Sequence, residues 1–295
     1  MKKETKGMLS LLLATMIWGS AFVAQSVGMD YIEPFTFQAI RCIVAAITLL
    51  PIVWLLDRGN RNGKSFLKRW LDKKLWLGGI CASIPLFFAV CLQQIGLVST
   101  DAGKSAFLTA LYIVMVPIFG LFIGKKPSKL ISLSVILAVF GLYFLSGADF
   151  SNLQFGDLCL IGCAIAFGVQ ILVVDRFAPY VDAVRMNVIQ SLFCGLISII
   201  PTVLLESPDA KNILACWFPL LYTGLMSMGI AYSLQIIGQK SMEPSRAALI
   251  MSLESVFAVL FGWLFLGELL SIHETIGCVL MLVAILLCQY KPKKK

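Results

Sequence analysis

The chain has 295 residues, of which 59% are hydrophobic and only 14% are charged, so it is much more apolar than a soluble domain. Stretches of about 17–25 apolar residues recur along its whole length, which predicts a multi-spanning helical membrane protein rather than a barrel of short alternating strands. The formal net charge of +8 would suit a nucleic-acid-binding protein, but the basic residues gather in the connections between apolar stretches. We therefore do not expect nucleic acid as a partner.

Taken in chain order, the apolar stretches predict ten transmembrane helices joined by mostly short connections. The first follows a lysine-rich start, as a signal peptide would, but it continues to about Gly28 and is therefore interpreted as a retained span. The predicted spans cover residues 8–28, 34–56, 75–97, 102–123, 129–147, 156–174, 184–205, 214–238, 245–266 and 272–290.

The basic residues are distributed very unevenly between the two ends of these spans. With the N-terminus in the cytoplasm, 21 of the 24 Lys and Arg residues fall on the cytoplasmic side, Lys104 and Lys211 fall outside, and Arg41 lies within the second span. Such an excess marks cytoplasmic connections, and it also favours contact with anionic lipid. The sequence therefore predicts a multi-pass protein of the cell (inner) membrane, embedded in the lipid bilayer, with both termini in the cytoplasm.

The second half of the chain repeats the first. A shift of 142 residues lays 91–124 over 233–266 without a gap, and both segments contain Leu-Gln-x-Ile-Gly, with Gln93 matched to Gln235. A weaker match at a shift of 149 residues pairs Trp18 with Phe167. Each half has five predicted spans, so the halves have opposite orientations in the membrane, as in many secondary transporters. We predict two repeats, over residues 1–147 and 148–295.

One carboxylate stands inside an apolar stretch. Glu254 lies about ten residues into the ninth predicted span, roughly 15 Å deep at about 1.5 Å per residue, near the middle of a bilayer core about 30 Å thick. A carboxylate at this depth is costly and should face a cavity or a partner. It could bind a cationic group or couple transport to protons, or it could be a structural residue that hydrogen-bonds helix ends or backbone.

Other polar and aromatic residues inside the spans could line the same site. Arg41 could hold a substrate carboxylate or phosphate, or it could form a fixed ion pair with Glu254 or an outer acid, or reach the interface. Amides such as Gln25 could bind a ligand or join helices, and aromatic residues such as Phe167 could line a pocket or only pack. The candidate substrate-binding residues are Trp18, Gln93, Tyr112, Gln170, Tyr232, Gln235 and Glu254, with Arg41 as a charge partner.

No catalytic, metal or cofactor site is expected. The nine Cys lie mostly in apolar stretches without the spacing of zinc ligands, and the single His273 has no HExxH context. Gly103-Lys104-Ser105 resembles the end of a phosphate-binding loop, but Val98 stands where that loop requires its first Gly. An enzyme is therefore not expected.

Several of these residues together resemble the EamA family of the drug/metabolite transporter superfamily. Trp18-Gly19-Ser20-Ala21-Phe22 resembles its Trp-Gly-Ser-x-Phe signature, and Leu266-Gly267-Glu268 its Leu-Gly-Glu. Leu253-Glu254-Ser255-Val256 resembles Leu-Glu-Pro-Val, although Ser255 replaces the proline, so a break of the ninth span is not implied. The resemblance implies a ten-helix bundle whose central cavity opens alternately to each side and moves small organic metabolites, often exporting amino acids or related compounds.

We therefore predict an all-α integral membrane protein with ten transmembrane helices arranged as two inverted five-helix repeats. Its predicted function is secondary transport, with export as the expected direction, of a small polar organic metabolite such as an amino acid. The alternative is a non-transporting membrane scaffold or sensor. The sequence favours this alternative less, because a scaffold needs a domain that it presents to partners and the sequence shows no soluble domain. Ten spans suffice for a complete cavity, so a monomer could function, and an oligomer is compatible with the sequence.

Overall fold

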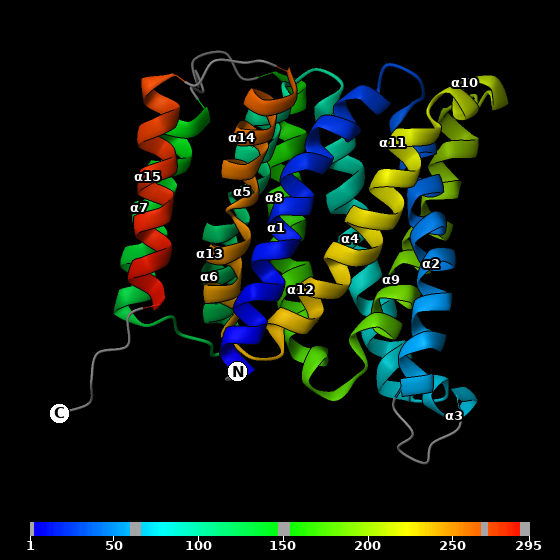
Figure 1. The fold of residues 1–295 in the computed structure, drawn as a ribbon, viewed down its shortest axis with the longest axis horizontal. Helices are drawn as coiled ribbons and strands as arrows, with labels where there is room; N and C mark the ends of the chain where they lie inside the picture. Colours follow the sequence, from blue (N-terminus) through cyan, green and yellow to red (C-terminus); the bar gives the residue numbers. More distant parts are fainter. Residues whose placement is uncertain (1–2, 60–65, 147–153, 267–270, 290–295) are drawn as a thin grey trace.

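The computed structural model describes residues 3–59, 66–146, 154–266 and 271–289, and these residues form helices without strands. The helices stand side by side in one bundle, and α1 begins at the same end at which α15 finishes (Figure 1). Within the described residues, nine helices are long and apolar enough to cross a membrane, and a further apolar helix over Lys129–Leu145 is shorter. The predicted all-α membrane fold is confirmed, whereas the count of ten spans remains a prediction.

The helices follow the order of the predicted spans, but three of those spans are divided. In the first half the helices are α1 (Lys3–Gly28), α2 (Pro34–Gly59), the short α3 (Phe66–Trp70), α4 (Lys73–Leu97), α5 (Ala102–Ala110), α6 (Tyr112–Phe122) and α7 (Lys129–Ser146). In the second half they are α8 (Phe155–Phe177), the 3-10 turn η1 (Ala178–Tyr180), α9 (Ala183–Leu205), α10 (Ala210–Ala215), α11 (Trp217–Tyr222), the π-helix η2 (Thr223–Ala231), α12 (Tyr232–Gln239), α13 (Pro244–Met251), α14 (Glu254–Leu266) and α15 (Ile272–Gln289).

Acidic side chains begin several of these helices. Asp72 Oδ1 accepts a hydrogen bond from the Lys74 backbone N–H at the start of α4, and Asp182 Oδ1 accepts one from the Arg185 N–H at the start of α9, both at 2.9 Å. Asp209 accepts in the same way at the start of α10. These carboxylates satisfy N–H groups that the first turn of a helix leaves without a partner. They mark where the chain turns back into the bundle.

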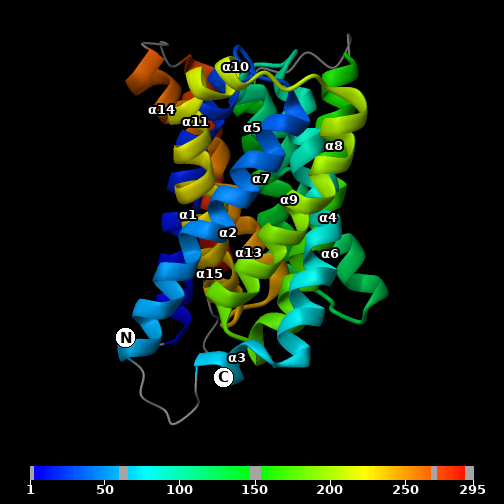
Figure 2. The ribbon, with the colours of Figure 1, turned by 90° about the vertical axis from the view of Figure 1, so that its right-hand side faces the viewer.

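The two halves pack through helices that occupy the same place in each. The second span of one half, α2, packs against α9 of the other, and the two lie side by side in Figures 1 and 2; in the same way α7 packs against α15. The contact between α4 and α8 has a counterpart in the packing of η2 and α12 along α1. These reciprocal contacts are those expected of an inverted repeat. The predicted boundary between residues 147 and 148 lies outside the described residues, as do Gly267 and Glu268 of the family signature.

Two spans are interrupted near their middle at matching positions. Leu111 separates α5 from α6, and Leu253 lies in the gap between α13 and α14; the repeat alignment pairs these two leucines. The ninth span is interrupted even though Ser255 replaces the proline of the family signature. Ser255 Oγ instead donates a hydrogen bond to the Ala106 carbonyl oxygen of α5 at 2.9 Å, which joins the two interrupted spans. Interrupted helices in the middle of a membrane are typical of transporter binding sites.

The eighth span contains the π-helix η2, and Asn187 of α9 lies against it. The Asn187 Nδ2 atom is 2.9 Å from the Met228 carbonyl oxygen, 2.7 Å from the Gly229 carbonyl oxygen and 3.0 Å from Ser233 Oγ. A π-helix disturbs the regular pattern of backbone hydrogen bonds, so a buried side-chain donor can satisfy its carbonyl groups. Asn187 therefore supports the irregular part of the eighth span.

Replacing Asn187 by Ala should lower the free energy of unfolding by about 2 kcal/mol, because the buried carbonyl group of Met228 loses its side-chain donor and that of Gly229 keeps only Ser233 Oγ. The measurement is the melting temperature of the purified protein in detergent. Replacement of the exposed Asn212 of α10 by Ala is the matched control and should leave the melting temperature unchanged. Equal melting temperatures for the two variants would show that η2 does not depend on Asn187.

Candidate functional site

A cavity lies between the two halves, where the interrupted spans meet. It contains about 460 Å³ of unoccupied space, including the part that opens to solvent. Seven of the eight predicted site residues line the cavity: Trp18, Arg41, Gln93, Tyr112, Tyr232, Gln235 and Glu254. Both halves of the chain therefore contribute to one site, and the role of each residue in binding remains a prediction.

The carboxyl group of Glu254 lies at the start of α14 and is the acidic group of the cavity wall. Its side chain is buried, and Oε1 has no hydrogen-bond partner within the described part of the chain. Tyr112 lies beside it at the start of α6, at the position that the repeat matches to Glu254, and its hydroxyl group interacts with the Glu254 carboxyl group. Buried polar groups without partners are costly, so Glu254 Oε1 is available to a polar ligand.

Arg41 of α2 supplies the positive charge of the cavity wall. Its Nε donates a hydrogen bond to Gln38 Oε1 at 2.5 Å and its Nη1 donates to Gln25 Oε1. The side chain is only 1% exposed, and no carboxylate of the described residues lies within ion-pair distance of it. Its Nη2 has no hydrogen-bond partner among those residues. Neutral amides therefore hold the guanidinium in place, and one of its donors is available to a ligand.

Besides Gln25, which lines the cavity and accepts a hydrogen bond from Arg41, three glutamines provide amide groups at or next to the cavity. Gln93 Nε2 donates to Thr109 Oγ1 at 3.3 Å, and Gln235 Nε2 donates to Gln170 Oε1 at 3.1 Å. Gln170 is fully buried and lies behind Gln235 instead of lining the cavity, which differs from its predicted place in the site. The reason is that Gln170 uses its carbonyl oxygen to hold Gln235, whose own Oε1 has no partner in the described structure.

Aromatic rings form the apolar part of the wall. The rings of Trp18 and Tyr232 meet edge to face with their centroids 5.1 Å apart, and those of Tyr112 and Phe167 do so at 6.2 Å. Both arrangements are favourable for aromatic pairs and keep the rings in fixed positions. The cavity therefore combines an apolar surface with a carboxyl group, a guanidinium group and amides.

Seven residues of the cavity wall are not among the candidate substrate-binding residues. Two of them, Gln25 and Phe167, were named as residues that could line a pocket, and the other five are Phe22, Ile171, Ser227, Met228 and Met251. Most are apolar residues inside apolar spans, where the sequence offers nothing to distinguish a cavity wall from ordinary packing. Ser227 is the exception, because it is a polar residue between Gly224 and Gly229, in the segment that forms the π-helix η2. The two glycines on either side of a polar residue were thus the available signal.

The sequence of this chain is similar to those of known proteins. Residues 5–147 and 154–289 match the sequence profile of the EamA-like transporter family. The chain belongs to this family. An uncharacterized transporter of Archaeoglobus fulgidus is 30% identical to this EamA protein over 282 residues, which cover 95% of this chain and 84% of the relative. The uncharacterized transporter YoaV of Bacillus subtilis is 24% identical, with 94% of each chain covered.

The similarity extends to a plant protein and to a solved structure. The WAT1-related protein At3g02690, chloroplastic, of Arabidopsis thaliana is 22% identical over 95% of this chain and 68% of its own length. A crystal structure with 18% sequence identity covers 97% of this chain and 96% of its own, with a TM-score of 0.75, which supports the fold. The EamA protein is thus a multi-pass membrane transporter, and family membership indicates transport in place of enzymatic catalysis.

Proposed function

We propose that this EamA protein is a secondary transporter that exports a small polar organic metabolite, such as an amino acid or a related compound, by alternating access. The observation that carries the proposal is the cavity between the two halves, with the carboxyl group of Glu254 at the interruption between α13 and α14. Polar groups at interrupted helices near the bilayer midplane are the usual place of substrate binding in inverted-repeat transporters. An ionisable residue inside a span also points to function.

The charges of the cavity favour a substrate that carries both signs. Glu254 and Arg41 line the same cavity, and neither is paired with a charged residue of the described structure. A substrate ammonium group would bind the Glu254 carboxylate, while a carboxylate would accept hydrogen bonds from the free donor of Arg41. The ring pairs formed by Trp18 and Tyr112 would contact the apolar part of the same molecule.

The proposed site of action is the cell (inner) membrane, with the end of the bundle at which α1 begins facing the cytoplasm. The excess of Lys and Arg at that end supports this orientation. The competing function is that of a scaffold or sensor, which would bind a ligand without moving it. The relatives that carry the name transporter favour transport.

The experiment that tests the proposal is counterflow in proteoliposomes that contain the purified protein. Labelled amino acids, sugars, nucleosides and amines are compared, with an excess of the same unlabelled compound inside the vesicles. We expect saturable, protein-dependent exchange of one class, because a carrier exchanges substrate across the membrane without an external energy source. Exchange of no class would favour the scaffold or sensor.

Replacing Arg41 by Gln should raise the KM for an amino acid about tenfold or more while changing that for the corresponding decarboxylated amine little. The reason is that hydrogen bonds to charged groups contribute about 1.5–3 kcal/mol and only the amino acid carries the carboxylate. Arg176→Gln, at an exposed position near the end of α8, is the matched control. An equal loss for both compounds would assign Arg41 a structural role.

A further inference from the structure

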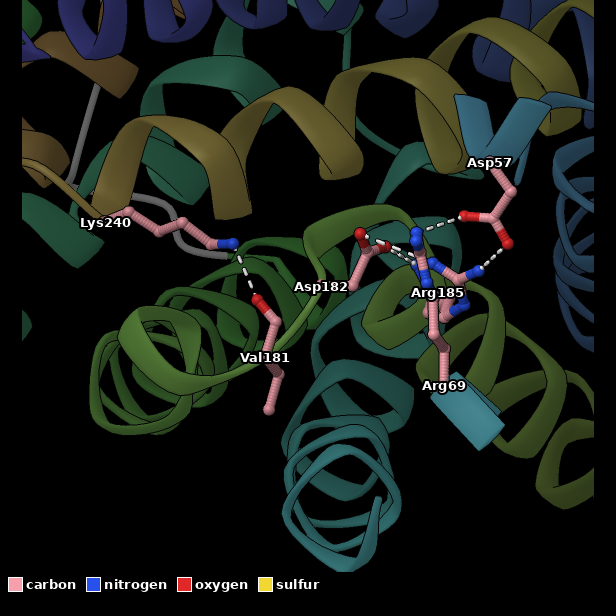
Figure 3. Close-up of polar contacts among 6 residues, drawn as sticks. All are labelled: Asp57, Arg69, Val181, Asp182, Arg185 and Lys240. Atoms are coloured by element: carbon pink, nitrogen blue, oxygen red, sulfur yellow. Dashed lines mark hydrogen bonds and ion pairs between the residues drawn. The ribbon is translucent and has the colours of Figure 1, made fainter. Parts of the chain in front are cut away.

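The helices α2 and α9 run side by side in opposite directions, and each ends in an acidic residue that contacts the start of the other. Near the end of α2, Asp57 Oδ2 pairs with Arg185 Nη2 in the first turn of α9, and Asp57 Oδ1 pairs with Arg69 Nη1 of α3 at 2.7 Å. Figure 3 shows the Asp57 carboxylate with a dashed line from each of its oxygens to one of these two guanidinium groups. The Arg185 side chain is 3% exposed and that of Asp57 13%, so the pair is largely shielded from water.

The opposite end of the same helix pair carries the reciprocal contact. Just after the end of α9, Glu206 accepts hydrogen bonds from the backbone N–H groups of Phe35 and Thr36 at 2.7 and 2.6 Å and from Thr36 Oγ1 at 2.7 Å. A carboxylate in this position satisfies free donors at the start of α2 and interacts favourably with the positive end of its dipole. Glu206 thus holds the second half of the chain against the first.

These two contacts join equivalent positions of the two repeats, one through an ion pair and the other through hydrogen bonds to backbone N–H groups and a hydroxyl. The shift of 149 residues that relates the two halves places Asp57 on Glu206 and Thr36 on Arg185. Each contact therefore joins an acid at the end of one helix to the third residue of its partner helix, and each joins the first half to the second. One lies at the end of the bundle where α1 begins, and the other lies at the opposite end (Figure 1).

A second pair of ionic contacts is also related by the repeat. Lys104 Nζ of α5 pairs with Asp157 Oδ2 of α8 at 2.8 Å, and Arg246 Nη1 of α13 pairs with Glu4 Oε1 of α1. The shift of 142 residues places Lys104 on Arg246, while the acids stand on the equivalent helices α8 and α1, about one turn apart in register. Here too each contact joins the two halves, and the two lie at opposite ends of the bundle.

We propose that these contacts form two latches, one at each end of the bundle, that release in turn as the cavity opens to each side of the membrane. The terminal latch consists of Asp57–Arg185 and Glu4–Arg246; the distal latch consists of Glu206–Thr36 and Lys104–Asp157. This inference rests on the proposed alternating access. Because the latches are equivalent by repeat and all four contacts cross between the halves, loss of one latch shifts the population toward the state open at its own end.

The test uses a single reporter cysteine, Ser227→Cys in the cavity wall, in a chain whose nine native cysteines are replaced. A membrane-impermeant maleimide is applied to either face of oriented vesicles, and the rate of labelling is measured. Asp57→Asn should raise the ratio of terminal-side to distal-side labelling about threefold, as expected for a partly shielded charged contact, and Glu206→Gln should lower it by a similar factor.

Matched controls carry the same change of charge without crossing between the halves. Asp72→Asn at the terminal end and Asp209→Asn at the distal end affect residues that begin helices of their own half, and both should leave the ratio unchanged. Glu4→Gln should act in the direction of Asp57→Asn, and it replaces that variant if Asp57→Asn does not fold.

Two results would overturn the inference, and they separate it from the proposed function. If the reporter is labelled from both faces but the latch variants match their controls or shift the ratio in one common direction, the latches are wrong and alternating access stands. If the reporter is reached from one face only in the parent and in every variant, alternating access itself is contradicted.

Discussion

Replacing Glu254 by Gln should reduce counterflow of a cationic or zwitterionic substrate about thirtyfold or more. The substitution keeps the shape of the side chain but removes the carboxylate from a buried cavity wall, where loss of one partner of a charged pair costs about 2–5 kcal/mol. The measurement is the initial rate of counterflow in proteoliposomes, made above and below neutral pH. If Glu254 carries protons, the variant should also lose any dependence of the rate on pH.

A matched acidic residue separates this effect from a general loss of charge. Glu243 directly precedes α13, outside the cavity wall, and Glu243→Gln should leave counterflow within about twofold of the parent rate. A Glu254→Gln protein that transports as well as Glu243→Gln would return Glu254 to the structural role that the sequence left open.

Replacing Gly19 by Val should lower the free energy of unfolding by about 3 kcal/mol and abolish transport. A Cβ atom at Gly19 would lie 2.5 Å from Phe257 Cβ and 2.8 Å from the backbone nitrogen of Ala258, so α1 and α14 would have to separate. Because α14 begins at Glu254, the movement would also displace the carboxyl group of the cavity. The measurements are the melting temperature in detergent and the rate of counterflow.

Gly103→Val provides the matched control for the close contact at Gly19. A Cβ atom at Gly103, in the first turn of α5, would meet no other atom within 4 Å. We expect a change of at most about 0.5 kcal/mol and normal transport. If both glycine variants lost the same stability, the cause would be the general effect of Val in a helix, and the contact between α1 and α14 would not be decisive.

The sequence was sufficient for the membrane class and for half of the residues that line the cavity. Long apolar stretches can only be spans, and a carboxylate such as Glu254 within one is costly enough to reveal its position. The repeat then pointed to Gln93 and Gln235, and the structure places both in the wall. Local chemistry and internal symmetry carried these predictions, because both can be read directly from one chain.

Contacts between distant parts of the chain could not be predicted in the same way. The amides that hold Arg41 come from its own helix and from α1, and a choice among many glutamines requires the helices to be placed first. The contact of Asp57 with Arg185 likewise joins two helices far apart in sequence. Gln170 was assigned to the wall because side-chain type cannot show whether an amide faces a cavity or supports a neighbour.

The most direct test of transport through the central cavity measures both binding and exchange of the same compound. A panel of amino acids, amines, sugars and nucleosides is first screened for compounds that raise the melting temperature of the purified protein but not that of Glu254→Gln. Each such compound is then measured by counterflow in proteoliposomes. We predict saturable exchange of the compound that binds; binding through Glu254 without any exchange would contradict a transporter and identify a sensor.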